Sequence, residues 1–254
     1  MAEYFPHDLD VRLRRDIKLV GVRRRLQLGK DRPGSVALTF AGRGYMLRTM
    51  TALPKRDRLA ERREATRTEI VDAAWEIARA GGLPAVTLRE VAARVGMQPP
   101  SLYSHFASKN AIYDAMFGQA WSDYLTACEK SVGSIPKPPR KALLYMVQTF
   151  VEFALADPVR FQLMNQRMVI DFEPTADAYE PSLQVMALFR EQLTRIGVSA
   201  DADADLCVAI IGGLVDAQLA NDPGGERWIA QLPRAMDMFA DEVGLPGPRL
   251  RRRR

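Results

Sequence analysis

The chain has 254 residues, of which 47% are hydrophobic and 26% are charged, a composition typical of folded globular proteins. Its longest apolar run, residues 207–215, is far shorter than the ~20 residues of a membrane-spanning helix. Its two cysteines are too few for a disulfide framework, so we expect a cytoplasmic protein that makes no membrane contact. Residues 1–67 carry 17 Lys and Arg against 8 Asp and Glu, whereas the remainder carries 19 against 23, so the N-terminal part suits a polyanionic partner.

Residues 1–54 form a basic extension with little helical or strand periodicity. It can be a disordered arm that adds non-specific affinity for a polyanion. It can equally be an artefact of an upstream start codon, with translation beginning at Met46 or Met50. In both cases we expect no compact fold in this segment.

Residues 55–67 are a charge run that precedes the first periodic segment. One interpretation is the solvated start of a helix. The other is an arm whose arginines (Arg56, Arg58, Arg62 or Arg63) reach a phosphate or a minor groove.

The first predicted helix covers residues 66–80. Thr66 and Glu69 have the spacing of a capping box, which marks a helix start. Ile70, Ala74 and Ile77 then share one face, and a Gly-Gly pair at 81–82 ends the helix.

A second helix and a tight turn follow from residue 87. Thr87 and Glu90 form another capping box. Gly96 stands where a helix commonly ends in a residue of left-handed conformation, which glycine adopts with the least strain. Between them, apolar residues recur at i, i+3, i+4 and i+7: Leu88, Val91, Ala92 and Val95.

A third, short helix begins at Pro99 and Pro100, because proline fits the first helical turn. Leu102 and Phe106 are four residues apart and should point inward, and Ser108 should cap the next helix. Helix, glycine turn and short helix predict a helix-turn-helix, whose second helix lies in the major groove of DNA.

Residues 67–116 read RTEIVDAAWEIARAGGLPAVTLREVAARVGMQPPSLYSHFASKNAIYDAM, and this run resembles the N-terminal domain of tetracycline-repressor-type (TetR/AcrR) transcriptional regulators. The most specific part is LYSHFASK at 102–109, which has the L-Y-x-H-F-x-x-K pattern of that family. The resemblance is looser beyond Trp121. It implies three helices that bind DNA in residues 55–117, and a helical ligand-binding and dimerisation domain in residues 118–246.

The resemblance places DNA contacts in three groups. Phosphate contacts fall at the start of the second helix, base-edge contacts at the start of the third, and further backbone contacts after it. For His105, a packing or capping role remains an equal alternative. The candidate DNA-binding residues are Thr87, Arg89, Gln98, Pro99, Pro100, Ser101, Tyr103, His105 and Lys109.

The rest of the chain predicts further helices and no strand, so the fold class is all-α. We expect one long helix at 111–132, then helices at 141–158, 161–170, 183–196 and 205–220, and a last helix within 221–244. Residues 171–182 contain two prolines and are predicted to be a loop, with Ser182 capping the following helix. Residues 247–254 should be a basic disordered tail.

Large, soft side chains cluster in the helices of the C-terminal half. The simpler interpretation is ordinary core, whereas the resemblance implies an apolar ligand cavity, to which adaptable Met and aromatic walls are suited. The candidate ligand-binding residues are Trp121, Tyr124, Phe150, Phe153, Met164, Met168, Phe172 and Met186. Small residues in helix 205–220 indicate a two-fold helical interface and a homodimer.

Catalytic, metal and cofactor sites are not predicted. The only histidines are His7 and His105, which argues against a zinc cluster or a Ser-His-Asp triad. Acids at 201, 203 and 205 imitate a calcium loop, but Leu206 stands where that loop needs glycine.

The sequence therefore favours a ligand-responsive regulator, most simply a repressor that binds a palindromic operator in double-stranded DNA as a dimer and is released by a small apolar effector. One alternative is a constitutive, non-specific DNA-binding or architectural protein. Another is an all-α enzyme that happens to carry a helix-turn-helix, which the lack of a nucleophile–base pair argues against.

Overall fold

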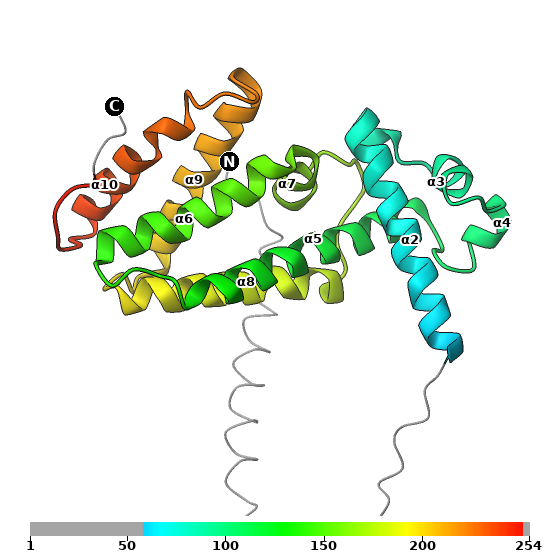
Figure 1. Ribbon diagram of the computed structural model, residues 1–254, viewed down its shortest axis with the longest axis horizontal. Coiled ribbons are helices and arrows are strands. Elements are labelled where there is room, and N and C mark those ends of the chain that lie inside the picture. Colours follow the sequence, from blue (N-terminus) through cyan, green and yellow to red (C-terminus); the bar gives the residue numbers. More distant parts are fainter. Residues whose placement is uncertain (1–57, 251–254) are drawn as a thin grey trace, which may run out of the picture. The chain divides into compact units, whose positions relative to one another are not determined.

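The computed structural model describes residues 58–250, all within one compact unit. The predictions for the basic extension, for Arg56 and for residues 251–254 lie outside the described residues. Every regular element in the described part is helical, which confirms the all-α prediction (Figure 1).

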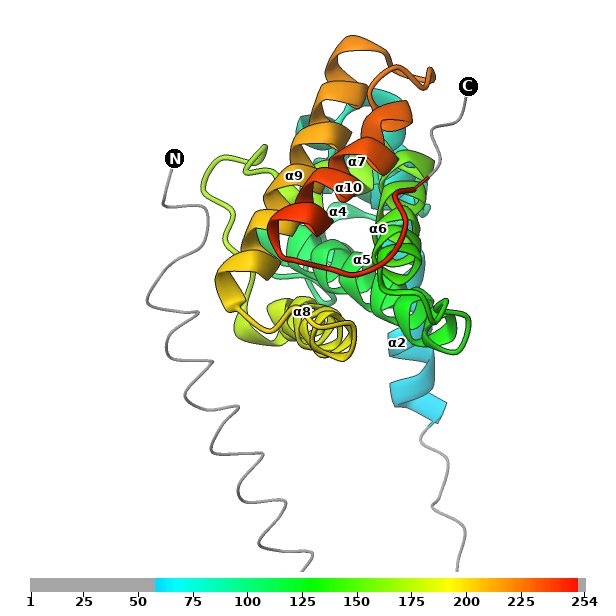
Figure 2. The same ribbon diagram turned by 90° about the vertical axis from the view of Figure 1, so that its left-hand side faces the viewer.

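The elements follow one another as a small N-terminal group and a larger C-terminal bundle (Figure 1). The first group is α2 (Arg58–Gly81), the 3₁₀ turn η1 (Leu83–Ala85), α3 (Leu88–Arg94) and α4 (Pro99–Leu102). The long helix α5 (Lys109–Val132) leads into α6 (Pro139–Ala156), α7 (Pro158–Asn165), α8 (Ala176–Arg195), α9 (Asp201–Asn221), the turn η2 (Ile229–Gln231) and α10 (Leu232–Glu242). In Figure 2, α8 is seen almost end-on and α9 rises away from it beside α10.

The first helix begins at least eight residues before the predicted start at Thr66. The Thr66 hydroxyl donates to the carbonyl of Arg62 (3.1 Å), a bond that a threonine inside a helix makes, so it is not a cap. Leu, Ala, Glu and Arg at 58–65 are all strong helix formers, and they extend the helix through the charge run.

The predictions for residues 161–182 were wrong in two places. α7 ends at Asn165 and does not continue to 170, and α8 begins at Ala176 with Pro181 inside it. Thr175 caps α8 by accepting a bond from the N–H of Ala178 (3.3 Å), whereas the Ser182 hydroxyl donates to the carbonyl of Tyr179.

Packing along α5 explains why α8 tolerates its proline. α5 and α8 make the most extensive helix contact in the described part, and they cross at Gly118 and Ala178. A Cβ added to Gly118 would lie 3.3 Å from the Ala178 Cα, so the two backbones approach closely. This contact outweighs the hydrogen bond that Pro181 cannot donate.

Two hydrophobic cores hold the described residues together. The first joins α2, α3 and α4 to α5 and continues into Leu163, Met164, Ala178 and Val185. The second joins α6, α9 and α10. The boundary predicted at 117/118 therefore falls inside α5, and the first core extends across it.

A buried arginine fastens the C-terminal segment to α6 and α10. Arg140 is 7% exposed and donates to the carbonyl of Leu245 through Nε (3.2 Å) and Nη2 (3.0 Å). It also donates to the carboxylates of Asp237 (3.3 Å) and Asp241 (2.6 Å). Asp237 in turn accepts the N–H of Leu250 at 2.9 Å, so the group ties residues 245–250 to the bundle.

Within residues 58–250, no single helix is long and apolar enough to cross a membrane. α6 and α7 reach that length and composition only when taken together across a bend of 113°.

Candidate functional site

The turn after α3 has the geometry that the sequence predicts. The Thr87 hydroxyl accepts the N–H of Glu90 (3.1 Å) and so caps α3. Gly96 has φ +69°, and the N–H groups of Gly96 and Met97 donate to the carbonyls of Ala93 (3.3 Å) and Ala92 (2.8 Å). These two bonds form a Schellman motif, which reverses the chain directly into α4.

The short helix α4 turns its apolar side inward and its polar side outward. Leu102 and Phe106 are 0% and 2% exposed and belong to the first core. Pro99 and Pro100 form the first turn, and Gln98 is the N-cap. Of the predicted DNA-binding residues, those that lie exposed are Thr87, Arg89, Gln98, Pro99, Pro100, Ser101 and Tyr103, whereas His105 and Lys109 are half-buried.

Two arginines of α2 hold the chain at the end of α4. Arg63 Nη2 donates to the carbonyl of Ser104 (3.1 Å), and Arg67 Nη1 donates to the carbonyl of His105. The Arg67 guanidinium also lies 4.2 Å from the centroid of the Phe106 ring. From the sequence, Arg63 was predicted as a possible phosphate or minor-groove contact, and Arg67 was assigned no role. The signal was present in their four-residue spacing, which puts both on one face of α2.

Substitution of Arg67 by methionine should weaken DNA binding about 10-fold, because a hydrogen bond from a charged group contributes roughly 1.5 kcal/mol or more. The slope of affinity against salt concentration should stay unchanged, since Arg67 positions the chain after α4 and neutralises no phosphate. Arg167→Met, an exposed position outside the helix-turn-helix, is the control. A slope reduced by about one unit for Arg67→Met would show a phosphate contact instead.

Helix α5 begins beside this surface. The Ser108 hydroxyl accepts the N–H of Ala111 (3.1 Å), which confirms the predicted cap. Lys109 Nζ lies 5.2 Å from the centroid of the Tyr113 ring, and the Tyr113 hydroxyl donates to the carbonyl of Leu83 (2.6 Å). The first turn of α5 is thus fixed to the N-terminal group of helices.

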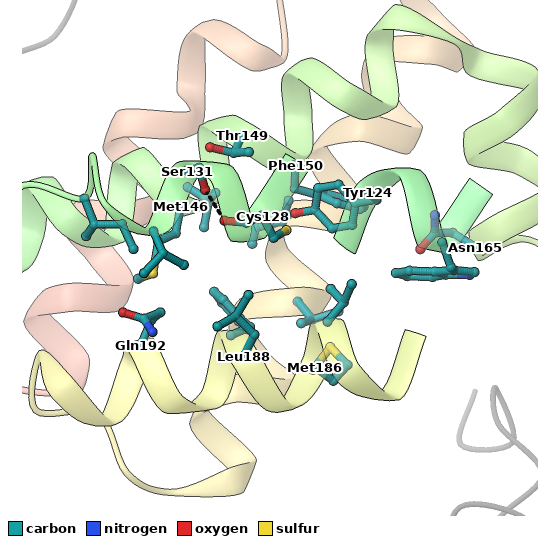
Figure 3. Close-up of a pocket in the computed structure, with 18 residues that line it drawn as sticks. Tyr124, Cys128, Ser131, Met146, Thr149, Phe150, Asn165, Met186, Leu188 and Gln192 are labelled. Atoms are coloured by element: carbon teal, nitrogen blue, oxygen red, sulfur yellow. Dashed lines mark hydrogen bonds between the residues drawn. The ribbon is translucent and has the colours of Figure 1, made fainter. Parts of the chain in front are cut away.

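The far half of α5 borders a cavity of about 110 Å³. Eighteen residues line it, mainly from α5, α6 and α8, with one from α7 and two from α9. Figure 3 shows Met186, Leu188 and Gln192 of α8 across the cavity from Tyr124 and Cys128 of α5.

Four of the eight predicted ligand-binding residues line this cavity: Trp121, Tyr124, Phe150 and Met186. The prediction missed several other lining residues, among them Cys128, Thr149, Asn165 and Gln192. No apolar pattern marks these positions, because they are polar or small residues.

The other four predicted residues lie elsewhere. Phe153 packs on Tyr124 with 4.8 Å between ring centroids, and Met164 is buried in the first core. Phe172 packs against Phe117, with ring centroids 6.3 Å apart. Met168 is 50% exposed, because α7 ends before it.

Burial keeps the titratable groups of the cavity wall neutral. It raises the pKa of the Tyr124 hydroxyl well above its ordinary value, and it also raises the pKa of the Cys128 thiol. Both groups are therefore protonated at neutral pH and act only as weakly polar wall atoms.

A second set of contacts ties the start of α8 to the start of α5. The carboxylate of Asp114 accepts both the N–H (2.7 Å) and the hydroxyl (2.8 Å) of Thr175. Asn110 Nδ2 donates to the carbonyl of Asp171 at 2.9 Å. These bonds join the start of α8 to the part of α5 that follows the helix-turn-helix.

Comparisons with known proteins agree with this geometry. The model of the "Bacterial regulatory proteins, tetR family" matches residues 70–116. The chain is similar to the tetracycline repressor protein class A from transposon 1721 of Escherichia coli, with 25% identity over 186 residues, which cover 69% of this chain and 81% of the repressor.

Two solved structures share the fold. One is a bacterial regulatory protein in the tetR family from Rhodococcus RHA1 (TM-score 0.55, 19% identity, 71% of this chain and 98% of that one). The other is the transcriptional regulator FadR from Bacillus subtilis in complex with stearoyl-CoA (TM-score 0.56, 15% identity, 68% and 96%). With a helix-turn-helix that the tetR family model matches and a helical fold behind it that these structures share, the chain is similar to bacterial transcription regulators of the tetR family.

Proposed function

We propose that the protein is a ligand-responsive transcriptional repressor, which binds a palindromic operator as a homodimer and leaves it when a small apolar effector binds. The observation that carries this proposal is the course of α5 (Lys109–Val132). This one helix starts next to the exposed face of α4, and its far half lines the cavity. Effector and DNA would therefore act on the two ends of one rigid element.

In this proposal the exposed residues around α4 contact DNA. Gln98 reads a base edge, where its amide can pair with adenine in two hydrogen bonds. Tyr103 is 54% exposed and, with Lys109, contacts the phosphate backbone. Thr87 and Arg89, both exposed at the start of α3, add further phosphate contacts.

Three substitutions test these roles on an operator found by footprinting DNA with the purified protein. Gln98→Ala should relax the preference at one base pair by ~1–3 kcal/mol. Tyr103→Ala and Lys109→Ala should instead weaken binding to all sequences alike, and Lys109→Ala should flatten the salt slope. Unchanged affinity in all three variants would refute these assignments.

The proposed dimer interface lies on α8 and α9. α9 leaves an apolar side uncovered in the protomer: Leu206 is 46% exposed, and Ala209 and Gly213, three and seven residues further along the same face, are exposed with it. Pairing α8 and α9 with their copies would form a four-helix contact. It would also set two recognition helices at the spacing of palindromic half-sites.

Gly213→Glu should convert the dimer to a monomer, because it places a charge in the middle of this apolar face. A Cβ at Gly213 meets nothing within 4 Å, so the protomer itself should remain folded. Sedimentation velocity and thermal unfolding measure the two effects separately. A variant that stays dimeric would place the interface elsewhere.

Release would follow from a shift in population. The cavity lies between α5, α6 and α8, so an effector that fits one α5–α8 arrangement better favours that arrangement. A ligand shifts the equilibrium only by its differential affinity, and a 100-fold difference corresponds to about 2.7 kcal/mol. Loss of the operator footprint on addition of an apolar molecule is the result that tests this step.

The excess of basic residues at 1–67 favours one other function, constitutive binding to DNA without sequence preference. The two functions differ in a competition experiment. A repressor keeps its operator in the presence of excess unrelated DNA, whereas an architectural protein is titrated away from it.

A further inference from the structure

The cavity wall is uncharged. None of its eighteen lining residues in the described part of the chain is Asp, Glu, Lys, Arg or His. The polar members are neutral, for example Thr149 and Asn165, and the pKa values of Tyr124 and Cys128 are shifted upward. An ionised ligand would lose its hydration here and gain no counter-charge, which is costly. The wall therefore discriminates against carboxylates and amines.

Most polar side chains of the wall already have partners within the protein. The hydroxyls of Ser131 and Thr149 donate to the carbonyls of Cys128 (2.8 Å) and Tyr145 (3.1 Å). The amide of Asn165 donates to the carbonyl of Phe161 at 3.2 Å. These groups make the wall slightly polar, but their donated protons are not available to a ligand.

Trp121 differs from these residues. Its indole Nε1–H is buried and has no hydrogen-bond partner among the described residues, the only such atom among the residues that line the cavity. Indole nitrogen can only donate. A buried donor without a partner is rare in folded proteins and needs an explanation, and an acceptor on a bound ligand is one.

The volume limits the size of the ligand. The cavity measures about 110 Å³, and an apolar cavity of roughly 150 Å³ binds benzene. The space as it stands thus suits at most one ring, and a substituent on that ring needs the flexible Met146 and Met186 side chains of the wall to move.

We propose that the effector is a neutral, single-ring molecule with a hydrogen-bond acceptor, such as an aryl ketone or ester, and that this acceptor binds Trp121 Nε1–H. The inference rests on the proposed function, because it names the ligand class of the same cavity. It assigns Trp121 as the residue that orients the effector.

Three probes of nearly equal shape test this on the full chain by calorimetry. Acetophenone is neutral and carries an acceptor, α-methylstyrene replaces that oxygen by a methylene group, and benzoate is ionised. Trp121→Phe is the matched variant, because it keeps an aromatic ring and removes the donor. Thermal unfolding of the variant checks that the cavity remains intact.

We expect acetophenone to bind the wild-type protein at least 100-fold more tightly than benzoate. Trp121→Phe should weaken acetophenone at least 10-fold and change α-methylstyrene less than 3-fold, since only acetophenone uses the donor. This difference between two ligands separates the hydrogen bond from a general change in packing.

Equal binding of benzoate, or an equal loss for both neutral probes in Trp121→Phe, would overturn the inference. So would the failure of all three probes to bind.

An operator footprint measured with the same probes separates failure of this inference from failure of the proposed function. If acetophenone binds as expected and the protein stays on the operator, the ligand class stands and the release step fails. If a charged molecule releases the protein instead, the proposed function stands and the ligand class is wrong.

Discussion

Arg140→Met should lower the free energy of unfolding by about 3 kcal/mol. The substitution leaves the buried Asp237 carboxylate without its guanidinium, and it removes both hydrogen bonds to the carbonyl of Leu245. Removing one partner of a buried ion pair typically costs ~3–5 kcal/mol, and we take the lower end because the Asp241 side chain is 39% exposed. Chemical denaturation of the variant and the wild type measures the difference.

Arg249→Met is the matched control. Arg249 contacts the same Asp241 at 2.7 Å, but its side chain is 77% exposed. An exposed pair contributes at most about 1 kcal/mol, so this variant should unfold nearly as the wild type does. If the two variants lost equal stability, burial of Arg140 would not be the cause.

The ion pair of Arg140 with Asp241 predicts that the stability of the protein depends on pH. The hydrogen bond from Arg140 lowers the pKa of Asp241 below its ordinary value, and Arg249 contributes less. Because the folded-state pKa is depressed, the stabilisation is complete above the unfolded-state pKa, near 4, and is lost as the pH falls through the folded-state value. The wild type should therefore lose stability on acidification below about pH 4, and Arg140→Met should lose less over the same range.

Gly118→Val should lower the free energy of unfolding by about 3 kcal/mol, the upper part of the usual range for overpacking. A Cβ at this position would lie 3.3 Å from the Ala178 Cα and 3.5 Å from its Cβ, and valine adds two more carbons. The side chain would meet the α8 backbone, which cannot turn away as a flexible side chain can. Since α8 also lines the cavity, effector binding should weaken together with stability.

Gly133→Ala controls for the replacement of a glycine at the end of the same helix, where Gly133 is the C-cap. Gly133 has φ −66°, and a Cβ there meets nothing within 4 Å, so alanine should be neutral or stabilising by about 0.4–1 kcal/mol. Thermal unfolding of the two variants and the wild type measures the difference in stability. A Gly118→Val protein as stable as the wild type would mean that α8 can move away from α5 at little cost.

The elements that were predicted correctly are those specified by neighbouring residues. Thr87, Gly96 and Ser108 each form the cap or turn that their local sequence indicates. Thr66 and Ser182 carry similar local signals and cap nothing. Strong helix formers precede Thr66, whereas contacts distant in sequence decide where α8 begins. Packing of α8 on α5 extends that helix back through Pro181.

The two candidate sites differ in the same way. The exposed surface of α4 follows from one short segment, since burying Leu102 and Phe106 leaves Ser101 and Tyr103 outward. The cavity depends on which faces of α5, α6 and α8 meet. Helical spacing alone cannot tell Phe150, which faces the cavity, from Phe153, which packs against Arg160 at 3.7 Å.

The core that crosses from one half of the protein into the other restricts how the halves can be exchanged between proteins. A chimera joined after residue 117 would graft Tyr113 and Phe117 without Phe172 and Tyr179, the rings they contact. A DNA-reading module transplanted from this chain would have to bring all of α5 and the beginning of α8 with it. The segment that must be transferred as a whole is then larger than the helix-turn-helix. A different C-terminal domain could be attached only if the ring contacts of Tyr113 and Phe117 were rebuilt in it.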